Sequence, residues 1–170
     1  IKLYDLYEGD IYVPIGCFND IWGLHPYKED YVDYSNNKPI CIESNIQLRE
    51  YQQPCLKAIE ENYTGLFIMG AGTGKTVTAL QCVNHLKQKT IWLTMTIDLL
   101  QQAKTECEKN MTCKTSAIVN GKSDLSGDIV FATVQTVSKL IDKGEIPQDT
   151  FGMIIGDEIQ HCVVSAESVM

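Results

Sequence analysis

Stretches of helical and strand periodicity alternate through residues 48–155 of the chain. Apolar side chains three and four positions apart predict amphipathic helices, and short runs of consecutive apolar residues predict buried strands. The pattern predicts helices at 48–63, 75–86, 97–109 and 134–141, and strands at 66–69, 90–94, 116–119, 128–133 and 153–155. Strands that alternate with helices of this length indicate βαβ units, and therefore an α/β fold with a parallel sheet flanked by helices.

Residues 1–46 follow a different pattern. They are aromatic and acidic, and they contain short strand-like runs such as 10–13. Turn-forming residues interrupt these runs at Pro14, Gly16, Gly23, Pro26 and Pro39. We therefore expect a small appended N-terminal module at 1–46 and one larger domain at 47–170.

A glycine-rich segment, 69–76, lies between the predicted strand 66–69 and the predicted helix 75–86. Glycines let the backbone approach a phosphate closely, and the N–H groups at a helix start point at such an anion. Lys75 can reach the β and γ phosphates of a nucleotide, and the Thr76 hydroxyl can bind the magnesium ion that bridges them. The general motif has a glycine where this chain has Met69. The residues expected to contact the nucleotide are Gly70, Gly72, Thr73, Gly74, Lys75 and Thr76.

Two adjacent carboxylates, Asp157 and Glu158, follow the apolar run 151–156. The carboxyl ends of parallel strands meet at one edge of a sheet, so we expect these carboxylates near Lys75. Asp157 would face the magnesium ion and Glu158 would polarise the attacking water. The sequence thus predicts an ATPase site whose catalytic residues are Lys75, Asp157 and Glu158.

The charge of the chain is unevenly distributed. The formal net charge is −8, which by itself disfavours nucleic acid as a partner. Residues 1–46 carry three lysines against eight acidic residues, whereas residues 75–122 carry seven lysines against three. The middle of the chain is therefore locally basic, and a solvated lysine surface remains an alternative to a nucleic-acid contact there.

The composition also limits the location of the protein. At 170 residues and 44% hydrophobic, the chain can bury one core, and no run approaches the length of a membrane span. The seven cysteines form no C-x-x-C pair, so buried thiols in a reducing compartment explain them better than zinc or disulfides. We therefore expect a cytoplasmic protein.

The phosphate loop and the Asp-Glu pair form the two halves of an ATP site. Together with the segments around them, they make the chain resemble the first RecA-like motor domain of superfamily 2 helicases. The resemblance is to DEAD-like helicases of the restriction-enzyme or phage type. Segment 48–52 is similar to the one in which a glutamine, here Gln52, recognises adenine. Segments 94–102 and 130–137 resemble those that hold a nucleic-acid backbone, and they place Thr96, Gln102 and Thr133 at the contact positions. Segment 157–160 matches the Asp-Glu-x-His/Gln box, in which Gln160 would sense a second motor domain.

The resemblance implies an ATP-dependent helicase or translocase with ATP and Mg²⁺ as cofactors. The implied partners are nucleic acid, DNA ahead of RNA, and a second motor domain, because the domain at 47–170 is expected to be incomplete at its C-terminus. Arg49 is the only arginine in the chain, so no arginine finger is available in cis and hydrolysis should be slow.

Two alternatives remain open at this point. One is another P-loop ATPase or a nucleotide kinase, which should carry several arginines in a lid. The other is a nucleic-acid-binding module with a vestigial ATP site, which should have lost at least one of Lys75, Thr76, Asp157 and Glu158.

Overall fold

The computed structural model describes residues 5–7, 10–12, 38–62, 65–119, 122–147 and 149–158. The chain divides into two units, residues 1–33 and 34–170. In the first unit, β1 (Asp5–Tyr7) pairs antiparallel with β2 (Asp10–Tyr12), which falls in the strand-like run expected from the sequence. None of the helices in the described ranges is long and apolar enough to cross a membrane.

The second unit is built on a five-stranded sheet with the order β7-β6-β8-β4-β9. Its strands are β4 (Thr90–Thr94), β6 (Thr115–Val119), β7 (Lys122–Ser123), β8 (Ile129–Thr133) and β9 (Met153–Gly156). Strands β6, β8, β4 and β9 run parallel, and the short β7 is antiparallel to β6. The predicted α/β class with a parallel sheet is confirmed.

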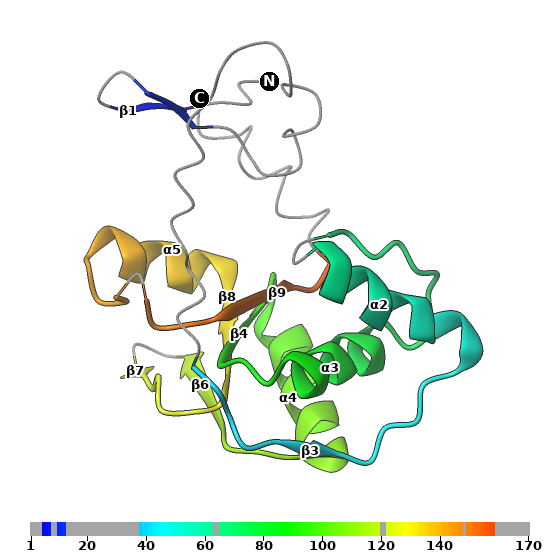
Figure 1. Ribbon diagram of the computed structural model, residues 1–170. Coiled ribbons are helices and arrows are strands. Elements are labelled where there is room, and N and C mark those ends of the chain that lie inside the picture. The colour runs from blue at the N-terminus through cyan, green and yellow to red at the C-terminus, as the bar shows by residue number, and fades with distance from the viewer. Residues whose placement is uncertain are drawn as a thin grey trace. The chain divides into compact units, whose positions relative to one another are not determined.

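Helices cover both faces of this sheet (Figure 1). On one face, α3 (Lys75–Leu86) and α4 (Ile97–Asn110) pack against Trp92 and Phe131, which lie side by side on β4 and β8. On the other face, α5 (Val134–Asp142) packs against the intervening side chains, such as Val130. Because successive strand residues point to opposite faces, burial of both faces explains the uninterrupted apolar runs 91–93 of β4 and 129–132 of β8.

Most predicted boundaries agree with the structure to within one residue. One exception is the helix expected at 48–63, which instead begins as the 3-10 turn η2 (Glu50–Gln52) and continues as α2 (Gln53–Asn62). Pro54 stands in the first turn of α2, where a missing N–H costs no helical hydrogen bond. The short strands β3 (Glu43–Ser44), β5 (Met111–Thr112) and β7 were not predicted.

Residues 38–46 pack with the larger unit. Strand β3 pairs antiparallel with β5, and Ile42, only 2% exposed, joins the core beneath α3 and α4. The Ile40 N–H donates to the Lys87 carbonyl at 2.9 Å. The division in the structure therefore falls after Asp33 and not at residue 46. An appended N-terminal module stays a prediction.

The strand predicted at 66–69 is not formed, and this expectation was wrong. Leu66 is 69% exposed and Ile68 is 90% exposed. The segment lies beside β9, but a cavity of about 300 Å³ is lined by both. A hydrogen-bonded ladder needs strands about 4.8 Å apart. Among the described residues, β9 pairs with β4 and forms no ladder with this segment.

The five described cysteines are free thiols. Cys82 and Cys107 are buried, as expected, whereas Cys41 is exposed. Burial raises the pKa of the Cys82 thiol to about 12, so it stays protonated at neutral pH.

Candidate nucleotide-binding site

The glycine-rich loop turns directly into α3, which begins at Lys75. Gly72 and Gly74 have φ of +73° and +86°, in the left-handed region that favours glycine. A Cβ on Gly74 would lie 2.8 Å from Nε2 of Gln52. Gly74 is therefore required both by its backbone conformation and by the close approach of a neighbouring side chain.

Gln52 is buried against this loop, with 3% of its surface exposed. Its Nε2 donates to the carbonyl oxygens of Thr73 at 3.1 Å and Gly74 at 3.4 Å, and its Oε1 accepts from the Arg49 N–H at 2.9 Å. A bidentate contact with adenine would need an amide N–H that the loop carbonyls now occupy. Recognition of adenine by Gln52 stays a prediction.

The two halves of the predicted site meet in the structure. Lys75 Nζ lies 3.1 Å from Glu158 Oε1, with both side chains about one-third exposed. The Asp157 N–H donates to the Leu93 carbonyl at 2.9 Å, which extends the β4–β9 ladder to the two carboxylates. The parallel pairing of β9 with β4 therefore places the two carboxylates beside the phosphate loop.

The environment of Asp157 suits a cation. Its pKa is raised, mainly by burial and then by the negative charge of Glu158, while Lys75 lowers it. The two adjacent carboxylates carry more negative charge than the single Lys75 ammonium group balances. A divalent cation such as Mg²⁺ therefore suits this site. No three His, Cys, Asp or Glu side chains converge into a metal site within the described ranges. A magnesium ion here would therefore combine Thr76 and Asp157 with phosphate and water ligands.

The candidate nucleic-acid contacts lie at the same edge of the sheet as the carboxylates. Thr133 ends β8 opposite Thr94 of β4, and Thr96 follows two residues later as the N-cap of α4. The Thr96 hydroxyl accepts from the Leu99 N–H at 3.3 Å, and Thr133 shares a 2.8 Å hydrogen bond with Thr136.

These two hydroxyls differ in access. Thr96 is exposed, while Thr133 is only 8% exposed. Gln102 is exposed on α4, and Gln160 lies outside the described residues. The roles of all four in binding or coupling stay predictions.

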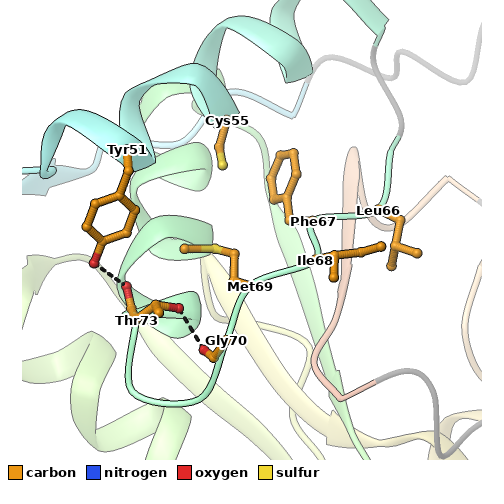
Figure 2. A pocket seen from close by; sticks show the side chains of 8 residues that line it. All are labelled: Tyr51, Cys55, Leu66, Phe67, Ile68, Met69, Gly70 and Thr73. Carbon is orange, nitrogen blue, oxygen red and sulfur yellow. Dashed lines mark hydrogen bonds between the residues drawn. The ribbon is translucent and has the colours of Figure 1, made fainter.

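Two residues that sequence reasoning missed also contact the loop. The Tyr51 hydroxyl donates to the Thr73 carbonyl at 3.0 Å (Figure 2), and the Thr78 hydroxyl donates to the Gly74 carbonyl at 3.0 Å. Tyr51 also lines a cavity of about 400 Å³ with Phe67, Met69 and other residues. Adjacency of Tyr51 to Gln52 was the available signal, but the sequence does not show where a tyrosine hydroxyl points.

Comparison with known proteins supports this arrangement. Residues 45–168 match the family described as "Type III restriction enzyme, res subunit". The chain belongs to this family. The match covers the loop, both carboxylates and the whole described sheet, and it confirms the predicted resemblance to the first motor domain of superfamily 2 helicases.

Several named proteins are similar to this member of the family. The "DNA 3'-5' translocase XPB2" of Sulfurisphaera tokodaii is 31% identical over 76% of the chain and 28% of its own length. The "Probable helicase D10" of Escherichia phage T5 is 30% identical over 86% of the chain and 32% of its own length. The "Putative DNA 3'-5' helicase Rad25" of Halobacterium salinarum is 24% identical over 81% and 23%. The chain thus spans about a quarter to a third of the length of these relatives.

Proposed function

We propose that this chain is the nucleotide-binding part of the first motor domain of an ATP-dependent helicase or translocase that acts on nucleic acid. The observation that carries the proposal is the 3.1 Å contact between Lys75 and Glu158, which joins the phosphate loop to the Asp-Glu pair. Membership of the restriction-subunit family supports the same reading. We propose DNA as the strand, since two of the relatives are named for action on DNA.

Each residue of the site has a defined task in this proposal. The loop N–H groups and Lys75 bind the β and γ phosphates. Glu158 orients water and accepts its proton, for which its carboxylate must first leave Lys75. Thr76 and Asp157 would hold Mg²⁺, which neutralises charge on the phosphates.

Hydrolysis by residues 1–170 should be slow. Arg49 is the only arginine in the sequence, and its guanidinium donates to the Tyr51 hydroxyl at 3.0 Å. An arginine finger contributes on the order of 10³–10⁵ to the rate in related reactions. We propose that a second motor domain supplies it.

The first experiment tests nucleotide binding. Thermal unfolding is measured with and without Mg·ATP for the wild type, for Lys75→Ala and for Lys139→Ala, a matched control on α5. Lys139 is exposed and lies on the helix that packs against the other face of the sheet. ATP should stabilise the wild type and the control but not Lys75→Ala. Equal stabilisation of all three would contradict the proposed site.

The second experiment tests turnover. Phosphate release is measured with single- and double-stranded DNA and RNA for residues 1–170, and for a longer form that carries a second motor domain. DNA should stimulate the longer form only, and Glu158→Gln in that form should abolish release while retaining ATP binding. Transfer of phosphate to a nucleoside acceptor in place of water would instead indicate a kinase. Strong stimulated release by residues 1–170 alone would contradict the need for a second domain.

A further inference from the structure

The carbonyl group of Thr73 accepts two hydrogen bonds from one side. The Tyr51 hydroxyl lies 3.0 Å from this oxygen, and Nε2 of Gln52 lies 3.1 Å from it. Both donors come from the 3-10 turn η2, which precedes the loop by about twenty residues in the sequence. Figure 2 shows the Tyr51 side chain directed at Thr73, with its hydroxyl bonded there.

These bonds fix the direction of a peptide plane. In a trans peptide the C=O and the following N–H point in opposite directions, and the described peptide bonds are all trans. With the Thr73 carbonyl drawn toward η2, the Gly74 N–H must point away from η2. The Gly74 carbonyl accepts the first hydrogen bond of α3, from the Thr78 N–H at 2.9 Å, so the Lys75 N–H points out of the N-terminal end of the helix.

The proton of the Tyr51 hydroxyl has a defined direction. Arg49 Nη1 donates to the same hydroxyl oxygen at 3.0 Å, so the hydroxyl hydrogen is left for Thr73. The Tyr51 residue is 51% exposed and does not belong to the buried core. Its hydroxyl therefore contributes to the shape of the loop more than to the packing of the fold.

We propose that Tyr51 is a positioning residue for the phosphate grip: its hydroxyl holds the Thr73–Gly74 peptide so that the loop N–H groups are oriented before a triphosphate arrives. The inference rests on the proposed nucleotide site and deepens it. Segment 48–52, which is expected to recognise adenine, would then have a second role. Through Tyr51 it positions the loop that binds the phosphates, whichever base the nucleotide carries. Orientation in advance raises affinity because the loop need not be ordered on binding.

The experiment compares ligands with and without a base. Affinities for Mg·ATP and for Mg·tripolyphosphate are measured by calorimetry for the wild type, Tyr51→Phe and the control Thr105→Val. The control also removes one exposed hydroxyl that donates to a backbone carbonyl, that of Gln101 within α4 at 2.8 Å. Tyr51→Phe should weaken both ligands by the same factor, about two- to tenfold, the effect of one hydrogen bond. Thr105→Val should bind both ligands as the wild type does.

Other outcomes would overturn the inference. A loss confined to ATP would mean that Tyr51 contacts the base or the ribose. Unchanged affinity for both ligands would mean that the hydroxyl positions nothing. If the wild type bound neither ligand, the proposed function would fail together with this inference.

A second measurement needs no nucleotide. Amide hydrogen exchange of the peptide that covers residues 70–76 should be faster in ligand-free Tyr51→Phe than in the wild type, while exchange in β4 and β8 stays unchanged. Equal exchange in the loop would contradict the positioning role even if nucleotide binding were normal.

Discussion

Lys75 and Glu158 form an ion pair, with 3.1 Å between Nζ and Oε1. The lysine that should bind phosphate thus contacts the carboxylate that should activate water. Both groups are about one-third exposed, so solvent weakens the pair. A nucleotide that enters this site must compete with Glu158 for Lys75.

The first prediction follows from that competition. Glu158→Gln should bind Mg·ATP about two- to fivefold more tightly than the wild type, because a partly exposed ion pair contributes up to about 1 kcal/mol. The gain should shrink at high salt, which screens the lost charge. Calorimetry at low and high salt checks both statements, and unchanged or weaker affinity would show that the pair does not oppose binding.

The second prediction concerns Gly74, whose positive φ and contact with Gln52 exclude a side chain. Gly74→Ala should lower the free energy of unfolding by roughly 1–2 kcal/mol and weaken ATP binding. Gly65→Ala is the matched control, because a methyl group on Gly65 would meet no heavy atom within 4 Å and its φ is not positive. Urea unfolding should show little change for Gly65→Ala. Equal stability of the two variants would contradict the close approach.

The third prediction separates two roles of Gln52. Its amide already holds the loop carbonyls and accepts from the Arg49 N–H, so Gln52→Ala should weaken ATP and GTP by the same factor. Competition binding with the two nucleotides measures this ratio. A loss larger for ATP than for GTP would instead establish adenine recognition, which the sequence predicts.

The fourth prediction uses the raised pKa of Asp157, caused first by burial and then by Glu158. In magnesium-free buffer at neutral pH, Asp157→Asn should increase the free energy of unfolding, by less than about 1 kcal/mol for a site open to solvent. The folded wild type takes up its proton at a higher pH than the unfolded chain. The wild type therefore gains stability relative to Asp157→Asn as the pH falls through the pKa of Asp157 in the folded state. The difference in stability between the two proteins shrinks accordingly.

A control variant that should lower the free energy of unfolding, in place of raising it, makes this test more specific. Asp98 is exposed in the first turn of α4, where a negative charge is favourable. Asp98→Asn should therefore lower stability at neutral pH by about 0.3–1 kcal/mol. Thermal unfolding across the acid range compares the two variants, and a pH-independent gain for Asp157→Asn would contradict the assigned cause.

The sequence by itself determined the alternation of elements and the chemistry of the site. Runs such as 91–93 and 129–132 are apolar because both faces of β4 and β8 are buried, and this pattern can be recognised in the local sequence. The glycines of the loop, Lys75 and the Asp-Glu pair were likewise visible, since phosphate binding demands those residue types in that order. Family membership rests on the same segments.

The tertiary structure alone decided which groups meet. No local pattern shows that Tyr51 and Gln52 hold the Thr73 carbonyl, because a side-chain hydrogen bond depends on where two distant segments are brought together. The same holds for Ile42, which packing assigned to the larger unit, and for residues 66–69, whose apolar run did not become a strand. Hydrophobic periodicity indicates which side chains are buried. It does not indicate which strand pairs with which, or which group a hydroxyl bonds to, because these contacts form only when the chain has folded.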